Sequence, residues 1–270
     1  TGMAAYLEPY VISEPDAKGA KVSTAAGTAR AASDDPTFGV AKISPYELTT
    51  TSYVDRNISR LTPANYYAKV FNMAMRSMRR DSVKMIFNGD GQSTNDMFGI
   101  KTAKNMAGSN IFATLEVEAV DENLLTELMF AYGGDEELGG NCRLYLNKKD
   151  LQALGKIRGT NEKRRLFDIV PDAANPNIGT IRDGGIIVPY SISKQLTALS
   201  ESTKGSSAIQ TMVYGDPQNY ELGLFGNYTV RVDESVKAVE RMLTVLGDAM
   251  VGGNLIVDKG FVVATLPANG

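Results

Sequence analysis

The longest stretch of helical periodicity in the chain begins at Thr62-Pro63 and ends before Asn88-Gly89. Threonine followed by proline is a common helix start, and Asn-Gly is a common stop. At 100° per residue, apolar and basic side chains fall on opposite faces of this predicted helix over about residues 63–87. The apolar face holds Tyr67, Phe71, Ala74, Met75, Met78 and Met85, and the basic face holds Lys69, Arg76, Arg80 and Lys84. We therefore expect a long helix that packs with one face and turns the other away.

The segment before this helix has two parts with different patterns. Residues 1–36 are rich in small and polar side chains, and residues 23–32 contain almost no large apolar side chain. Such a segment cannot bury enough surface to offset the entropy that it loses on ordering. It predicts an exposed hairpin or arm, with a loose terminus as the alternative. Between residues 38 and 53, apolar residues among Thr and Ser predict strands.

Beyond the long helix, short apolar segments are separated by turn residues. Helices are expected after Asp121 and after Asn147, which are both good capping residues. Residues 236–246 fit a helix by spacing and a strand by composition. No regular alternation of strand and helix appears, and this favours the α+β class. Strands are predicted at residues 142–146, 186–190, 209–214, 255–257 and 261–266, the last two flanking a hairpin turn at Asp258-Lys259-Gly260.

The composition argues against most enzyme chemistry. The chain has 270 residues, enough for one large or two small domains, and a formal charge of −3, so no overall basic field attracts nucleic acid or membrane. It contains no histidine, which removes the commonest general base and metal ligand. Cys142 is the single cysteine and excludes an intrachain disulfide. Its apolar surroundings predict a small core residue.

Motifs that would carry chemistry are absent or incomplete. Residues 90–96 have the wrong spacing for a calcium loop, and no phosphate-binding glycine loop or Gly-x-Ser-x-Gly elbow occurs. Asp34-Asp35 and Glu136-Glu137 are interpreted as solvated loop charges. The apolar run at residues 261–266 is far too short to cross a membrane. We expect no catalytic residue, no cofactor, no metal and no membrane contact.

Four sequence blocks, in a constant order, resemble the major capsid protein family of tailed bacteriophages. Each block alone is short, and the set is spread over residues 38–266. The blocks are Phe87-Asn88-Gly89-Asp90-Gly91 with Phe98-Gly99-Ile100; residues 144–147 with Asp150-Leu151 and a basic loop ending in Leu166-Phe167; Val213-Tyr214-Gly215-Asp216; and residues 239–246 with residues 258–266.

The resemblance implies a Hong Kong 97-like fold. Residues 1–38 would form an extended loop that reaches across a neighbouring subunit, and residues 39–118 the first part of a peripheral domain with a spine helix. Residues 119–228 would form an inserted axial domain, and residues 229–270 the closing strands of the peripheral domain. The implied function is that of a structural subunit that forms hexamers and pentamers of an icosahedral virion shell around packaged DNA.

The resemblance also implies partners and shows departures. Portal, scaffold or protease and decoration proteins would join the shell, which would assemble in the bacterial host cytoplasm. The family's amino-terminal arm has no counterpart before the extended loop, so we expect a longer native protein whose start is removed by maturation or cloning. Ala31, Arg241 and Asp248 occupy the positions of the lysine, asparagine and glutamate that cross-link some members. We therefore expect no autocatalytic cross-link.

Three other interpretations stay open at this point. An encapsulin-like nanocompartment shell would share the fold but enclose enzymes. A histidine-free enzyme would show convergent carboxylates and lysines in a pocket. A non-viral binding module would recognise a partner strand through the arm. For Lys69, Arg76, Arg80 and Lys84, contact with DNA phosphates, contact with a neighbour's acidic residues and simple solvation are all compatible with the sequence.

Overall fold

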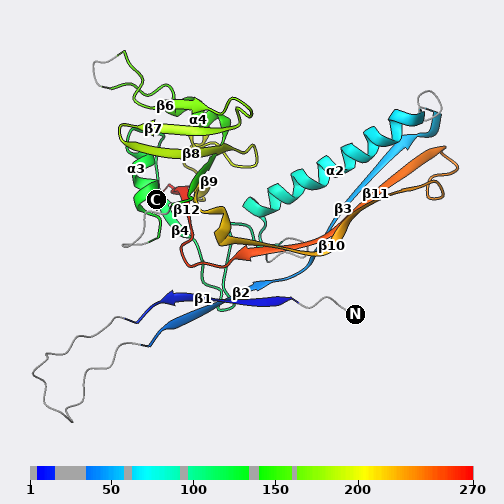
Figure 1. Ribbon diagram of the computed structural model, residues 1–270, viewed down its shortest axis with the longest axis horizontal. Helices are drawn as coiled ribbons and strands as arrows, with labels where there is room; N and C mark the ends of the chain where they lie inside the picture. Colours follow the sequence, from blue (N-terminus) through cyan, green and yellow to red (C-terminus); the bar gives the residue numbers. More distant parts are fainter. Residues whose placement is uncertain are drawn as a thin grey trace, which may run out of the picture.

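The computed structural model describes residues 5–15, 35–57, 63–91, 97–133, 140–159 and 163–269, with the backbone alone for residues 63–67. These residues form helices and three sheets of two, three and seven strands (Figure 1), which confirms the α+β class. The small sheets are the hairpin of β1 (Tyr6–Ser13) and β2 (Thr37–Ile43), and the sheet of β10 (Tyr220–Asp233), β11 (Met242–Leu255) and β3 (Tyr46–Asp55), in that order.

The seven-stranded sheet forms one body of the molecule (Figure 1). Its two edges are β4 and β6, and the pairs β4–β12 and β5–β8 are parallel while the others are antiparallel. All six residues of β12 are buried, as expected of an apolar strand inside a sheet. In order across the sheet the strands are β4 (Ala113–Glu116), β12 (Phe261–Leu266), β9 (Ile209–Gly215), β5 (Arg143–Leu146), β8 (Ile186–Ile192), β7 (Ile178–Asp183) and β6 (Asp168–Pro171).

Two short helices pack on this sheet through leucines. The helix α3 (Leu124–Phe130) buries Leu124, Leu125 and Leu128 in the same cluster as the sheet residues Leu144 and Leu146. The predicted core position of Cys142 is confirmed, because its side chain is buried in this cluster and burial raises the pKa of its thiol.

The helix α4 (Lys148–Leu154) is fixed to a distant segment by polar side chains. As predicted, the Asn147 side chain caps it by accepting a hydrogen bond from the Lys149 amide at 3.1 Å. The fully buried carboxylate of Asp150 accepts bonds from the amides of Leu199 and Ser200, at 3.0 and 2.8 Å. One of the four sequence blocks thus joins α4 to the short 3₁₀ helix Leu199–Glu201.

The helix α2 (Pro63–Asn88) lies along the three-stranded sheet (Figure 1), and its predicted position is confirmed. Met78 is fully buried and packs in one cluster with Leu48 and Val251 of the sheet. Phe71, also expected on the packed face, is 48% exposed, so the sheet covers that face only in part. The predicted cap Thr62 and the side chain of Tyr67 lie outside the described residues.

Two local predictions need correction. The turn at Asp258-Lys259-Gly260 makes no hairpin, because β11 pairs with β10 and β3 whereas β12 pairs with β4 and β9. The Lys259 amide instead donates to the carbonyl of Ile111 at 2.7 Å, and the turn leads the chain from one sheet to another. Asp121 was predicted to cap α3 but lies two residues before the N-cap, which is Asn123. The Asp121 carboxylate nevertheless accepts hydrogen bonds from the Asn123 and Leu124 amides.

The strands cross the boundaries expected between the domains. The strand β12 was expected to close the peripheral domain, yet it lies inside the seven-stranded sheet, and β4, expected in the same domain, forms an edge of that sheet. The strand β10 extends across residue 228. The ambiguous segment 236–246 begins as a turn and continues as the strand β11. The division at residues 118/119 and 228/229 remains a prediction.

We predict that Asp150→Ala lowers the free energy of unfolding by about 2–4 kcal/mol, because it leaves the buried Leu199 amide without an acceptor. Asp172→Ala is the matched control, since the exposed Asp172 carboxylate makes a similar bond to the Ala174 amide at 2.7 Å. The control should lose less than about 1 kcal/mol. Urea unfolding of both variants measures the difference, and equal losses would contradict the structural role assigned to Asp150.

Candidate assembly surfaces

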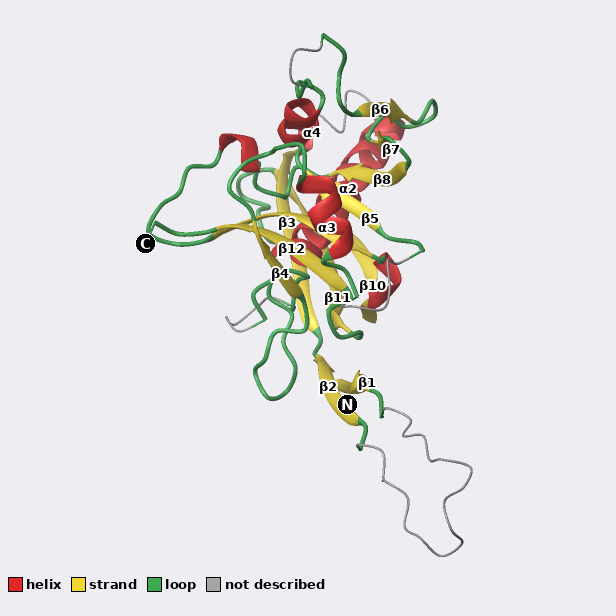
Figure 2. Cartoon of the chain, turned by 90° about the vertical axis from the view of Figure 1, so that its left-hand side faces the viewer, coloured by secondary structure: helices red, strands yellow, loops and turns green. Residues whose placement is uncertain are grey.

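The β1–β2 hairpin projects away from the rest of the molecule (Figure 2). Its two strands form a sheet of their own, and an isolated pair of strands is at best marginally stable in water. Four of its large apolar side chains are nevertheless exposed: Leu7 by 52%, Val11 by 45%, Ile12 by 45% and Phe38 by 63%. An exposed group of this kind on a thin projection marks a surface for another molecule. Within the segment 1–36 predicted as a hairpin or arm, residues 6–13 form a strand that pairs with residues 37–43, and residues 1–4 and 16–34 lie outside the described residues.

The base of the hairpin is fixed to the body of the protein. Tyr10 is 5% exposed and packs in a cluster with Phe87 and Ile111. The Tyr6 hydroxyl donates to the Glu221 carboxylate on β10, and burial together with this bond raises the pKa of Tyr6 well above its usual value. The hairpin is therefore a held projection, and within the described chain its outer part and the face that carries Leu7 have no partner surface.

Asn254 connects the hairpin base to two other segments. Its fully buried amide group donates to the carbonyls of Lys42 on β2 and Lys104, at 3.2 and 3.0 Å. Its side-chain oxygen accepts from the Leu255 amide at 2.9 Å. One asparagine thus satisfies backbone groups of β2, β11 and the loop that follows α2. Sequence reasoning missed this residue, since a single asparagine inside a strand carries no distinguishing signal.

The basic face of α2 is open to solvent. Lys69, Arg76, Arg80 and Lys84 are all exposed, as predicted, and none forms an ion pair with another described residue. Arg79, which was not among the predicted basic residues, is also exposed and widens this basic stripe. These cations repel one another. Asp81 lies on the same helix, three residues before Lys84, and its carboxylate offsets part of this repulsion.

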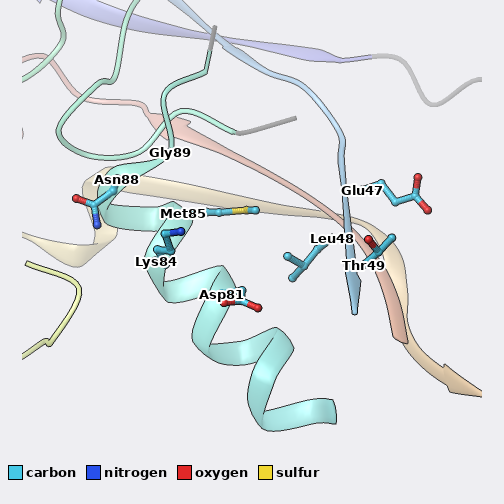
Figure 3. A pocket seen from close by; sticks show the side chains of 8 residues that line it. All are labelled: Glu47, Leu48, Thr49, Asp81, Lys84, Met85, Asn88 and Gly89. Carbon is cyan, nitrogen blue, oxygen red and sulfur yellow. The ribbon is translucent and has the colours of Figure 1, made fainter. Parts of the chain in front are cut away.

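A polar hollow of about 440 Å³ lies between α2 and β3. Figure 3 shows that Lys84, Asp81 and Met85 come from the helix and Glu47 from the strand, with Met85 extending toward the strand. Its carboxylates, Asp81 and Glu47, stand on opposite walls of this open groove. The groove suits contact with a polar surface. Throughout the described ranges, no group of three or more acidic or cysteine side chains is arranged to hold a metal, and no helix is long and apolar enough to span a membrane.

The first of the four sequence blocks, residues 87–91 with residues 98–100, forms the joint between α2 and the seven-stranded sheet. Gly89 and Gly99 pass so closely that a Cβ on Gly99 would lie 2.6 Å from the Gly89 amide nitrogen, which no larger residue tolerates. The Gly99 amide donates to the Gly89 carbonyl at 2.9 Å. The side chain of Asn88 donates to the carbonyl of Gln195 at 2.8 Å, which ties the end of the helix to the other body.

A lysine is buried at this joint. Lys101 is 4% exposed, and its ammonium donates to the side-chain oxygen of Asn88 and to the carbonyl of Gln210, both at 3.1 Å. Both acceptors are uncharged, so the positive charge has lost its water without gaining a carboxylate, and burial lowers the pKa of Lys101 to about 8. No pattern in the sequence distinguished Lys101 from the other lysines.

Two of the three cross-link positions, Arg241 and Asp248, lie in the described structure. Ala31 lies outside the described residues. Arg241 is exposed in the turn before β11 with a φ of 56°, and Asp248 lies on β11, where its carboxylate accepts a bond from the Thr229 hydroxyl at 2.7 Å. The absence of this cross-link chemistry remains a prediction from the residue types.

The projecting hairpin, the long helix on an antiparallel sheet and the separate seven-stranded body together define a shell-forming subunit. The model of the phage capsid family matches residues 6–266, and the chain belongs to this family. It is a structural subunit of a phage capsid, as predicted, and its location is the virion capsid. No curated protein matches the chain.

Solved capsid structures share the fold at low sequence identity. The capsid of a native GTA particle is similar with a TM-score of 0.71 and 14% identity, covering 99% of this chain and 86% of that chain. Gordonia phage Cozz gives 0.63 and 13%, with 97% and 81% covered. Mycobacterium phage Adephagia gives 0.63 and 10%, with 100% and 87% covered. At these identities the likeness confirms the predicted capsid fold and leaves the roles of single residues open.

The lowered pKa of Lys101 predicts a pH-dependent stability. Between pH 8 and about 10.5, the unfolded chain keeps a proton that the folded chain has released, so the free energy of unfolding rises with pH through this window. Below pH 8 the lysine is charged in both states and its burial is costly. Relative to Lys101→Met, the wild type should therefore gain up to about 3 kcal/mol between pH 7 and pH 10.5.

Urea unfolding of both proteins across this range measures the change, and the titration of other groups cancels in the difference. Lys148→Met, at an exposed lysine, is the control and should show no such trend. A constant difference between wild type and Lys101→Met would show that the ammonium is solvated in solution.

Proposed function

We propose that copies of this chain assemble as hexamers and pentamers into an icosahedral shell around packaged DNA, and that the β1–β2 hairpin of each copy lies across a neighbouring copy. The exposure of Leu7, Val11, Ile12 and Phe38 on a two-stranded projection is the observation that carries this proposal. Membership of the phage capsid family supports assembly into a shell.

The energetics suit repeated weak contacts. Full burial of one such side chain from full exposure contributes about 1.5–3 kcal/mol, and the four side chains are already partly buried, with 45–63% of each still exposed. One hairpin therefore provides a modest contact, but a closed shell makes the contact once per subunit, and simultaneous contacts multiply in effect. The fixed hairpin base lowers the ordering cost, because the hairpin is held in its projecting direction before it meets a neighbour.

The basic face of α2 is proposed to contact DNA phosphates on the inside of the shell. The support is local: Lys69, Arg76, Arg80 and Lys84 form one exposed stripe in a chain whose net charge is −3. Such contacts do not read sequence and suit packaged DNA of any composition. Contact of the stripe with a neighbouring copy is the second candidate.

The assembly partners proposed from the family are a portal protein, a scaffold or maturation protease, and decoration proteins. Assembly is proposed to take place in the cytoplasm of the bacterial host. Membership of the phage capsid family does not favour the alternatives considered from the sequence, which were an encapsulin-like compartment, a histidine-free enzyme and a non-viral binding module.

Shell assembly should depend on the apolar hairpin surface. We predict that the double variant Leu7→Ser, Phe38→Ser folds normally but fails to form shells, because it removes the two most exposed large side chains of the hairpin. Electron microscopy and sedimentation of the full chain, expressed with its neighbouring genes, measure assembly. Val257→Ser, at a 41% exposed valine outside the hairpin, is the control. A wild-type protein that stays monomeric under these conditions would overturn the proposed function.

The basic stripe is tested with Arg76→Gln, Arg80→Gln, Lys84→Gln. Shells should still form, and the slope of log affinity against log salt for double-stranded DNA should fall by about 3, one unit per lost phosphate contact.

Exposed lysines elsewhere serve as the matched control for these three changes, as Lys42→Gln, Lys194→Gln, Lys259→Gln. If the stripe variant instead loses assembly without DNA present, the stripe contacts a neighbouring copy.

A further inference from the structure

Charged residues in the seven-stranded body are strongly segregated along the chain. Between Lys104 and Arg143 the sequence has no lysine or arginine but has eight acidic residues. From Arg143 to Arg165 it has eight basic residues and two acidic ones. One of the two acidic residues, Asp150, is buried, and its carboxylate accepts hydrogen bonds from backbone amides. A random distribution of charges would not place such blocks next to each other.

The topology carries these blocks to opposite edges of the sheet. The acidic block contains β4, which is one edge strand, and α3, which follows it. The basic block contains α4 and the loop that leads into β6, the other edge strand. In Figure 1, β6 and α4 lie at one end of this body and β4 at the other. We name these the acidic edge (Glu116, Glu118, Asp121, Glu122, Glu127) and the basic edge (Lys148, Lys156, Arg158, Arg165).

The acidic edge surrounds an open hollow of about 410 Å³, lined by Glu116, Glu118, Asp121 and Glu127 among others. All four side chains are exposed. Glu118 is paired with Lys204 at 2.7 Å, which lowers the pKa of Glu118, but the other acidic side chains of this edge form no ion pair with a described residue. The edge therefore presents uncompensated negative charge around a depression.

The basic edge surrounds a larger open hollow of about 730 Å³, lined by Lys148, Lys156 and Arg165 together with apolar residues such as Ile169. These three basic residues are exposed and form no ion pair with a described residue. Each edge also carries an exposed apolar side chain: Val170, on β6 between two residues that line the basic hollow, is 39% exposed, and Phe130 at the end of α3 is 56% exposed. Both edges thus combine charge with apolar area, as protein interfaces do.

We infer that the acidic edge of one copy binds the basic edge of the next copy, head to tail, around each ring of subunits. This inference rests on the proposed function and names the surfaces that join subunits within a ring. Two different edges of one body that complement each other make a heterologous contact, and such contacts close into rings when the rotation between copies allows it.

A second copy fits both edges better than another partner. Nucleic acid would match the basic edge but would be repelled by the acidic edge of the same body. A neighbouring copy neutralises both edges in one contact and brings Phe130 and Val170 into the same interface. Charge complementarity also steers each acidic edge toward a basic edge. It opposes pairing of two acidic edges or of two basic edges, because like charges would then meet.

The test uses charge reversal in the full chain. One variant, Glu116→Lys, Glu122→Lys, Glu127→Lys, gives a body with two basic edges. The other, Lys148→Glu, Lys156→Glu, Arg165→Glu, gives a body with two acidic edges. Each alone should raise the protein concentration needed for assembly by at least about tenfold. The combined six-residue variant keeps the wild-type net charge, exchanges the two edges, and should assemble like the wild type.

A mixture of the two reversed proteins gives the sharpest result. Basic-edged and acidic-edged copies can alternate around a ring of six but not around a ring of five. The mixture should therefore form hexameric sheets or tubes and no closed shells, as seen by electron microscopy. Association in the mixture should weaken as salt is added, because salt screens the contact.

The outcomes separate this inference from the proposed function. If the wild type forms no shell, the proposed function fails, and association of the two reversed proteins in low-salt sedimentation still decides whether the edges bind. If the wild type forms shells and either reversed protein assembles at the wild-type concentration, the edge contact is wrong. Loss of DNA binding with normal assembly in the acidic-edged variant would assign the basic edge to nucleic acid. Thermal unfolding of each variant checks that its fold is intact.

Discussion

A sheet of two strands has no second layer, and this constraint governs the outer part of the molecule. The β1–β2 hairpin can bury Tyr10 at its base, where helix and loop residues surround it, but it has nothing to lay over Phe38 farther out or over Leu7 on the opposite face of the strand. A compact protein buries such apolar side chains in its own core. Here they can be removed from water only by contact with another molecule. The same division runs through the rest of the chain. The packed face of α2 is covered by its sheet only in part, and the edges of the seven-stranded body hold charges with no partner in the described structure.

The interior joints explain how such an open molecule keeps its shape. Asn254 joins the hairpin base to β11, and Asn88 joins the end of α2 to the other body. Both are amides that donate to backbone carbonyls, and neither carries a charge whose desolvation would have to be repaid. Lys101 is the exception, a buried ammonium held by neutral acceptors at the place where helix and sheet body meet. Burial of the Lys101 charge destabilises the contact between the two bodies while the lysine is protonated. The stability of that contact therefore depends on pH.

Local signals in the sequence predicted what depends on neighbours along the chain. The helix α2 follows from Thr-Pro, Asn-Gly and the methionine spacing, and the start of α4 follows from Asn147. The turn at Asp258-Lys259-Gly260 was recognised as a turn, but its partners were wrong, because strand pairing depends on residues far away. For the same reason the sheet of β12, the burial of Lys101 and the role of Asn254 could not be derived. The exposure of the basic stripe was predictable, since it required only the geometry of one helix. The charge edges needed the strand order, although the absence of lysine and arginine between residues 104 and 143 could be read beforehand.

The position of β12 has a consequence for synthesis on the ribosome. This strand lies between β4 and β9, yet it comes after all the other described strands in the sequence. The hairpin and α2 emerge early, whereas the seven-stranded body stays split, with β4 detached from β9, until residues 261–266 have been translated. Nascent chains in neighbouring polysomes therefore lack a finished body to join. Because β12 fills the position between β4 and β9, a chain that stops before residue 261 has no complete seven-stranded body, and such fragments are at a disadvantage in the growing particle.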